Sequence, residues 1–208
     1  MAENTQERVA GNLTRNTIAE MLAKNFQRLP DREQKLLTHG PLFLATNASL
    51  AGLIANSLYR RALNVTRGVI ASSLPMAVLP FMTTFTLYSG VVSNPLLLGD
   101  LNCPSCVLLR GALVGVVGGA VYPVLLALPI NLGFAVLHST IVKPEKGNTL
   151  RYCVDVSRPV LRKMRVVMVI QALFGTYLSS RNFETYHKLA QMAFDSDKEE
   201  LLDENVLK

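Results

Sequence analysis

Charged residues are scarce and unevenly placed in this chain. Of its 208 residues, 17% are charged and 50% are hydrophobic, whereas soluble domains carry about 25% charged residues on average. Four stretches hold no charge, the last of them short: residues 41–59, 68–99, 111–137 and 166–180. A helix needs roughly 20 apolar residues to cross a hydrocarbon core of about 30 Å. The gaps therefore favour a membrane protein over a soluble protein with buried helices.

Other absences exclude whole classes of function. No Asp or Glu lies within a predicted span, so an intramembrane proton relay or cation site has no carboxylate to form it. The chain has no phosphate-binding loop, nucleophile elbow or metal-ligand cluster, and its three histidines are far apart. We therefore expect a protein that is not an enzyme and needs no cofactor or metal. The polar, acidic first residues predict neither a secretory signal peptide nor a cleavable mitochondrial presequence.

The uncharged stretches predict an all-α membrane bundle of four transmembrane helices. The spans are expected over residues 41–59, 68–90, 111–132 and 166–180. The fourth is short and depends on its basic flank. Two pairs of prolines, Pro75 with Pro80 and Pro123 with Pro129, are expected to kink or break the second and third spans, because each proline frees a backbone carbonyl.

Composition divides the chain into three parts. These are an N-terminal soluble or interfacial helical segment, a transmembrane domain and a polar acidic tail, over residues 1–40, 41–180 and 181–208. In the first part, a capping box and helical spacing predict an amphipathic helix over 17–29. A second short helix starts at Pro30 and is expected to stop at His39-Gly40-Pro41. The acidic tail is expected to be solvated and partly disordered.

Small residues recur at helical spacing in two of the spans. Gly111, Gly115 and Gly119 form two consecutive Gly-x-x-x-Gly steps, and Ala48 and Gly52 share a face of the first span. Without side chains there, two helices can approach closely and gain van der Waals contacts. Such faces serve either packing within the bundle or an interface with a partner or a second copy of the chain, and the sequence leaves both open.

Basic residues gather next to the spans, in the connections 60–67 and 138–165. The candidates for contact with anionic headgroups such as cardiolipin, or with partner loops, are Arg60, Arg61, Arg158, Arg162 and Lys163. The positive-inside rule places these loops on the matrix or cytoplasmic side and both termini on the other. The basic residues are not interleaved with aromatic ones in one stripe, so they predict no nucleic-acid surface.

Cys103 and Cys106 have the two-residue spacing of redox dithiols and half zinc sites. A zinc site needs four ligands, and a thioredoxin-like motif needs a strand–helix context that is absent here. A disulfide and two ordinary cysteines both remain open.

Several short motifs resemble the transmembrane protein 126 family, closer to its A-type than to its B-type member. They are Asn56-Ser-Leu-Tyr-Arg-Arg61, Asn64-Val-Thr66, Leu74-Pro-Met-Ala77 with Pro80-Phe81, Gly99-Asp-Leu101 with Cys103 and Cys106, Tyr122-Pro-Val, Leu126-Ala127 with Pro129 and Asn131, Lys146-Gly-Asn148, Pro159-Val and Arg162-Lys-Met164. The resemblance covers roughly residues 25–180. None of these motifs has an explained chemistry, so they indicate a family without indicating a site.

The resemblance implies a multi-pass mitochondrial inner-membrane protein that helps to assemble respiratory complex I. Its partners would be membrane-arm subunits and other assembly factors, which it would bind as a non-enzymatic chaperone. The proline-interrupted spans suggest a different function, that of a small-solute transporter or channel. That function predicts a polar cavity near the bilayer midplane, with Asn56 or Asn131 facing it.

Overall fold

The fold is a bundle of antiparallel helical rods, seen in a computed structural model that describes residues 24, 26–101, 103–138 and 149–206. Its elements are α2 (Asp31–Ala62), α3 (Val69–Tyr88), η1 (Ser89–Ser93), α4 (Asn94–Leu97), α5 (Pro104–Val116), η2 (Val117–Val121), α6 (Tyr122–Leu137) and α7 (Thr149–Val206). All the elements in the described part of the chain are helical, which confirms the all-α class. The amphipathic helix expected over 17–29 falls mostly outside the described residues.

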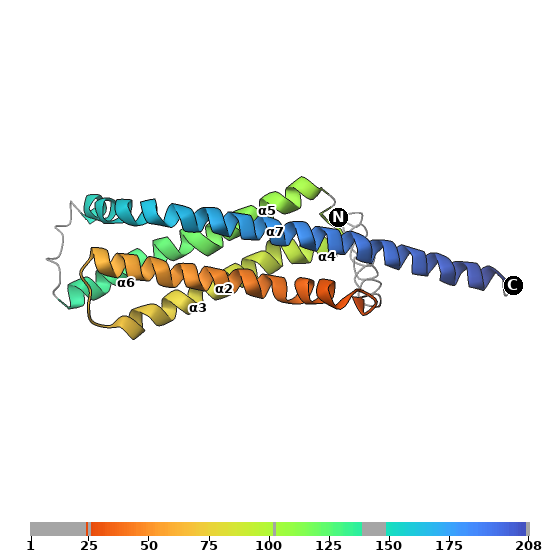
Figure 1. The fold of residues 1–208 in the computed structure, drawn as a ribbon, viewed down its shortest axis with the longest axis horizontal. Coiled ribbons are helices and arrows are strands. Elements are labelled where there is room, and N and C mark those ends of the chain that lie inside the picture. The colour runs from red at the N-terminus through yellow and green to blue at the C-terminus, as the bar shows by residue number, and fades with distance from the viewer. Residues whose placement is uncertain (1–23, 25, 102, 139–148, 207–208) are drawn as a thin grey trace, which may run out of the picture.

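The helical elements join into four rods that run up and down in turn (Figure 1). They are α2, then α3–η1–α4, then α5–η2–α6, and finally α7. The most extensive packing pairs α5 with α7 and α2 with α3, while α2 also packs on α6 and α7. Figure 1 shows α7 running the length of the bundle and projecting beyond it at its C-terminal end.

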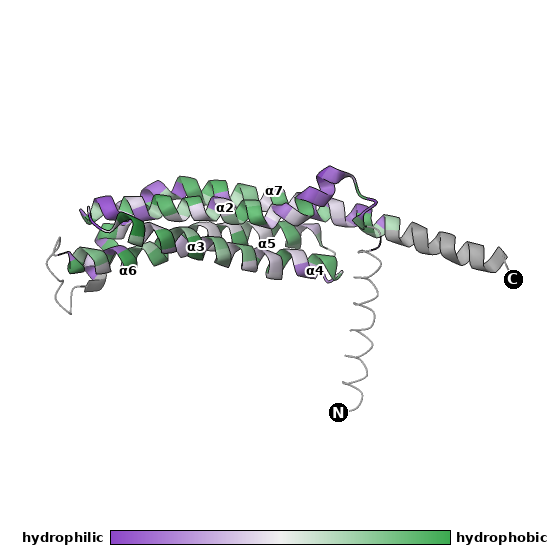
Figure 2. Cartoon of the chain, turned by 90° about the horizontal axis from the view of Figure 1, so that it is seen from below, coloured by the Kyte–Doolittle hydropathy of each residue, from purple (hydrophilic) through white to green (hydrophobic). Residues whose placement is uncertain are grey.

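Three helical stretches are long and apolar enough to cross a membrane: Asp31–Ala62, Val69–Leu97 and Pro104–Leu137. Many large apolar side chains on their outer faces are exposed, including Ile70, Leu74 and Leu125. Figure 2 shows hydrophobic residues along the middle of the bundle and hydrophilic ones gathered towards its ends. This distribution suits helices surrounded by lipid, because exposing apolar outer faces to lipid costs no free energy.

Helix α7 is not among the three candidate spans. Between Arg165 and Arg181 it carries fifteen uncharged residues, 166–180, fewer than the roughly 20 that a perpendicular crossing needs. The segment is nevertheless part of a 58-residue helix. The fourth helix of the bundle is therefore present, while its crossing of the membrane remains a prediction.

The expected helix end at His39-Gly40-Pro41 is wrong, because α2 runs through it as one helix of 32 residues. Proline normally disfavours the helical conformation in the residue before it, partly through a clash with that residue's Cβ. Gly40 has no Cβ, which removes this clash. Gly40 is also buried against the Leu178 side chain of α7, so the small residue serves helix packing as well.

Helix α3 continues through Pro75 and Pro80 and α6 through Pro129, so the spans are not broken at these three prolines. The irregularities are two π-helical turns that each end two residues before a proline: η1 before Pro95, and η2 before Pro123, which was expected to disturb the third span. In η1 the N–H of Asn94 donates to the Ser89 carbonyl, and in η2 that of Tyr122 donates to the Val117 carbonyl.

The position of the two π-turns has a steric reason. A proline ring inside a regular α-helix clashes with the carbonyl four residues earlier, which here belongs to Val91 or Gly119. In a wider turn with i to i−5 hydrogen bonds, that carbonyl lies away from the proline ring. No hydrogen bond of the turn then needs the N–H that proline lacks. The chain thereby keeps two long helical rods where broken spans were expected.

Two further expectations about irregular segments need correction. The basic connection expected over 138–165 is helical from Thr149 onward, which places Arg158, Arg162 and Lys163 on α7. The acidic run 195–204 also lies within α7, where a partly disordered tail was expected. The chain was also divided after residues 40 and 180 by composition. Both positions lie inside helices, because α2 runs through residue 40 and α7 through residue 180.

The turn between α2 and α3 requires two left-handed residues, Asn64 with φ 52° and Gly68 with φ 67°. Asparagine tolerates this conformation better than most residues, and glycine adopts it freely. Helix α2 ends there with Arg60 and Arg61 in its last turn and begins with Asp31 and Glu33 in its first. Both placements complement the helix dipole.

Candidate functional site

The glycines of α5 form a very close helix contact against α7. A Cβ placed on Gly111 would lie 2.6 Å from the Gly175 carbonyl oxygen, and one on Gly175 would overlap the Gly111 carbonyl. One turn further on, a Cβ on Gly115 would overlap the carbonyl oxygen of Gln171. The two backbones are therefore in direct contact, which only glycine allows at these positions.

The remaining small residues of the two predicted faces are also packed inside the chain. A Cβ on Gly119 would lie 3.0 Å from the Gln171 side chain. Gly52 of α2 lies against the Met76 carbonyl of α3, and Ala48 is fully buried. The sequence left open whether these faces serve the bundle or a partner, and the geometry places all five small residues in the bundle interior.

A chain of buried polar side chains links α2, α3 and α6. The Asn131 Nδ2 donates to Asn56 Oδ1 at 2.8 Å, and Asn56 Nδ2 donates to the hydroxyls of Ser72 at 3.2 Å and Ser73 at 3.1 Å. Both asparagines are almost fully buried, with exposed fractions of 1% and 0%. These three bonds join different helices, so they tie α2 to both α3 and α6.

This pairing removes the main support for a transporter or channel. That function needs Asn56 or Asn131 to face a polar cavity, but the two amides bond to each other across the helix interface. Neither residue is among those that line the groove between α2 and α7 or the cavity beside Arg60.

Arg60 departs from the expectation of a cation reaching the lipid interface. Its side chain is only 9% exposed, and its guanidinium donates to Ser72 Oγ and to the carbonyls of Val65 and Arg67. The other four predicted basic residues, Arg61, Arg158, Arg162 and Lys163, are exposed. Arg61 lies in the last turn of α2 and the other three in the first part of α7, and Figure 1 shows the end of α2 and the start of α7 at the same end of the bundle.

A second buried polar cluster joins α3 to α7 and was not predicted. Tyr88 and Ser179 share a hydrogen bond of 3.1 Å between their hydroxyls, and Asn182 Nδ2 donates to the Tyr88 hydroxyl at 3.1 Å. All three side chains are buried. The sequence held no signal for this contact because Asn182 lies in the expected polar tail, where side chains were taken to face water.

Cys103 and Cys106 stand at the start of α5 as free, exposed cysteines. A hydrogen bond from the Cys106 thiol lowers the pKa of the Cys103 thiol. Among the described residues, no group of three or more His, Cys, Asp or Glu side chains could hold a metal ion.

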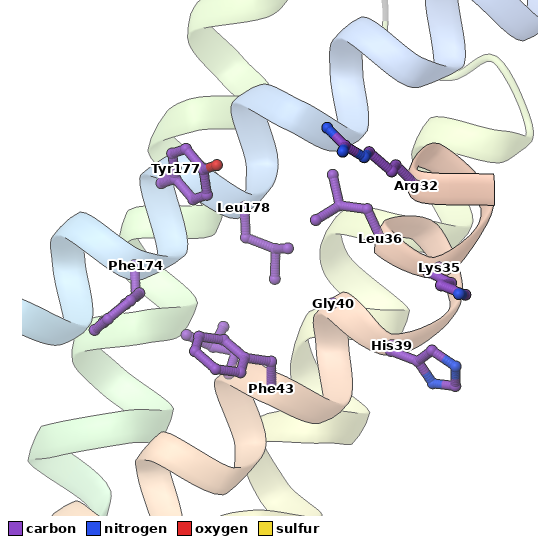
Figure 3. A pocket seen from close by; sticks show the side chains of 10 residues that line it. Arg32, Lys35, Leu36, His39, Gly40, Phe43, Phe174, Tyr177 and Leu178 are labelled. Carbon is purple, nitrogen blue, oxygen red and sulfur yellow. The ribbon is translucent and has the colours of Figure 1, made fainter. Parts of the chain in front are cut away.

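An open groove of about 410 Å³ lies between α2 and α7, and we refer to it as the α2–α7 groove (Figure 3). Its lining residues are Arg32, Lys35, Leu36, His39, Gly40, Phe43, Leu44, Phe174, Tyr177 and Leu178. Nothing in the sequence indicates this groove, because its two walls are more than 120 residues apart in the chain.

The floor of the α2–α7 groove is aromatic and its rim is cationic. Phe43 and Phe174 meet edge to face with their ring centroids 5.7 Å apart. Phe43 and Tyr177 are 58% and 57% exposed. Figure 3 shows Arg32 at the end of the groove nearest the start of α2. The groove thus offers apolar rings along its length and positive charge at one end.

These features define the class of protein: an all-helical membrane protein whose helices are joined by close glycine contacts and by hydrogen bonds between buried side chains. Comparison with known sequences identifies its family. The family model described as Transmembrane protein 126 matches residues 16–196. The chain belongs to the transmembrane protein 126 family, as its motifs indicated.

Among its relatives, mouse Transmembrane protein 126A is 45% identical over 84% of this chain and 89% of its own length. The human A-type protein is 44% identical over 83% of this chain and 88% of its own. The rat protein named Complex I assembly factor TMEM126B, mitochondrial, is 32% identical over 78% of this chain and 70% of its own. The greater likeness to A-type relatives was predicted and is confirmed. No solved structure matches the chain.

The contact between α5 and α7 predicts the effect of adding one methyl group. Gly111→Ala should destabilise the bundle by about 1–3 kcal/mol, because the new Cβ has no room against α7. The matched control is Gly133→Ala, since a Cβ on Gly133 has no neighbour within 4 Å. The control should be neutral or slightly stabilising. Thermal unfolding in mild detergent measures both, and equal melting temperatures would contradict the close approach.

The asparagine pair predicts energetic coupling between two helices. In a double-mutant cycle, Asn56→Ala and Asn131→Ala should couple by about 0.6–1.7 kcal/mol, the range for hydrogen bonds between membrane helices. Asn47→Ala serves as the control, because its amide bonds to the Phe43 carbonyl of its own helix. Unfolding free energies in detergent provide the measurement. Coupling of Asn131 with Asn47 as large as with Asn56 would show that the cycle reports general destabilisation instead.

Proposed function

We propose that this protein is a non-enzymatic assembly factor for respiratory complex I in the mitochondrial inner membrane. The observation that carries the proposal is its membership of a family whose B-type relatives, 28–32% identical to it, are named mitochondrial complex I assembly factors. It would act by binding, as a membrane chaperone that holds hydrophobic membrane-arm subunits until their partners in the respiratory chain arrive.

In this proposal α7 is the fourth transmembrane helix. Its segment 166–180 packs against α5, which belongs to a candidate span, through Gln171 and Gly175. Its other face exposes Val166, Val169 and Leu173, which suits lipid and not water. Arg165 and Arg181 would extend along the helix to the two interfaces, as long cationic side chains do.

The α2–α7 groove is the surface on which we place the partner. We assign it to an apolar transmembrane helix of a membrane-arm subunit that carries an acidic residue at its interfacial end. Phe43, Phe174 and Tyr177 supply the aromatic contacts that dominate interface energies, and Arg32 and Lys35 supply complementary charge at one end. A helix laid in a groove between two helices is a common recognition mode.

Anionic lipids such as cardiolipin have a place in the same proposal. The exposed cations Arg61, Arg158, Arg162 and Lys163 lie at one end of the bundle, where each would contribute about 1 kcal/mol of attraction to an anionic membrane surface.

Deleting the protein tests the proposed function directly. Complex I should decrease and stalled membrane-arm intermediates should accumulate, with the other respiratory complexes unchanged, because only complex I would lose its chaperone. Native gel electrophoresis of mitochondrial membranes and activity of each complex measure this. Normal complex I assembly in a clean deletion line would reject the function.

The α2–α7 groove predicts which substitutions weaken partner binding. Phe43→Ala with Tyr177→Ala should reduce co-purification of membrane-arm subunits about tenfold or more, because two aromatic anchors are removed. The control pair Leu109→Ala and Leu125→Ala removes equally exposed side chains, 62% and 66%, outside the groove. Quantitative mass spectrometry of the purified, tagged protein measures the bound subunits.

A photo-crosslinking amino acid in place of Tyr177 identifies the occupant of the groove, with one in place of Leu125 as control. An adduct with an apolar helix of a complex I subunit at residue 177 alone supports the assignment. Adducts with phospholipid alone at residue 177, or equal loss of partners in both alanine pairs, would show that partners do not dock there.

A further inference from the structure

The turn between α2 and α3 gathers positive charge without any acidic counterpart in the local sequence. Arg60, Arg61 and Arg67 lie within eight residues, and no Asp or Glu occurs between Glu33 and Asp100. Ion pairs such as Arg181–Glu184 and Lys188–Glu33 involve residues near the start of α2 and the later part of α7. Among the described residues, no ion pair neutralises Arg60, Arg61 or Arg67.

Arg60 is the unusual member of this group, because it is charged and more than nine-tenths buried. Its Nη1 donates to Ser72 Oγ at 2.9 Å, and its Nη2 donates to the carbonyls of Val65 at 2.9 Å and Arg67 at 3.3 Å. All three acceptors are neutral. A guanidinium has five N–H donors, so these bonds leave two for another acceptor. Burying a cation among neutral groups costs free energy that an anion would recover.

An open cavity of about 410 Å³ lies beside Arg60. Arg61 and the polar side chains of Ser57, Asn64, Thr66 and Ser73 line it as well. Every formal charge on its lining is therefore positive, and its other polar groups can donate hydrogen bonds to oxygen atoms. This is the donor set that proteins use for phosphate groups, with arginine binding two oxygens at once.

The start of α3 adds backbone donors to the same place. Gly68 caps α3 without any side-chain hydrogen bond to the first turn, and Val69 lines the cavity. The first N–H groups of a helix have no partner within it and carry the positive end of its dipole. An anion is favoured at such a position, and here the cationic cavity and the helix start coincide.

We propose that this cavity, lined by Arg60, Arg61 and the hydroxyls of α2 and α3, is a binding site for a phosphate group. The group can come from the headgroup of an anionic phospholipid or from a soluble phosphate. Going inward from Arg61, the exposed face of α2 carries Ser57, Ile54 and Leu50. A lipid bound by its phosphate would therefore find an apolar helix face for its acyl chains.

The test uses the full-length protein purified in mild detergent, with two probes. Phosphatidylglycerol is compared with phosphatidylcholine of the same acyl chains, and binding is measured by native mass spectrometry. Inorganic phosphate is compared with chloride at equal ionic strength, and binding is measured from the melting temperature. Arg61→Gln removes one exposed cation from the cavity, and Arg151→Gln removes an exposed cation from the start of α7 that does not line it.

The expected result is a loss specific to the cavity. Arg61→Gln should weaken binding of phosphatidylglycerol, or of inorganic phosphate, about tenfold, the effect of losing one charge-assisted hydrogen bond, while Arg151→Gln leaves it unchanged. Arg60→Lys keeps the charge but loses the fork of the guanidinium, so it should weaken binding as well. The melting temperature without ligand separates this effect from misfolding.

The probe that responds identifies the source of the phosphate group. Preference for phosphatidylglycerol that depends on Arg61 assigns a lipid headgroup, and stabilisation by inorganic phosphate that depends on Arg61 assigns a soluble anion. Equal losses in Arg61→Gln and Arg151→Gln would mean diffuse surface attraction and would overturn the proposal. Binding of neither probe in an Arg61-dependent way would overturn it too.

Discussion

The contact of bare backbone between α5 and α7 is the constraint on which the other interhelical contacts of α7 depend. At Gly111 and Gly175 the two helices approach as closely as their main chains allow. This fixes the axial position and rotation of α7, and with them the height at which Asn182 meets Tyr88 and the side on which Tyr177 faces α2. A side chain at either glycine would separate the rods and alter both contacts.

Polar groups inside the bundle serve specificity of packing in this chain. The amides of Asn56 and Asn131 and the hydroxyls of Tyr88 and Ser179 are buried and bond across helix interfaces. In lipid, apolar side chains do not drive helices together, so small residues and interhelical hydrogen bonds decide which faces meet. The buried polar groups therefore fix how the helices pack, and binding falls to surfaces such as the α2–α7 groove.

Much of the fold could be predicted from the sequence, and the errors have local causes. The three long uncharged stretches correspond to the three candidate spans. The predicted helix end at Gly40 was wrong, because this residue lacks the Cβ that clashes with a following proline. No helix breaks at Pro75, Pro80 or Pro129, and the irregularity next to the spaced prolines is the π-turn η2 before Pro123. The helix propensity of proline describes that residue alone, whereas here the residues before Pro41 and Pro123 decide whether the helix continues.

The sequence by itself determined the helical class, the membrane setting, the family and the small-residue faces. These depend on the order of apolar, charged and small residues along the chain, which is local information. Only the tertiary structure decided that Gly111 meets Gly175, that Arg60 turns inward, and that Phe43 and Tyr177 line one groove. Such contacts join residues far apart in the chain. They depend on how each helix is rotated about its axis, and that rotation is fixed only when all four helical rods pack together.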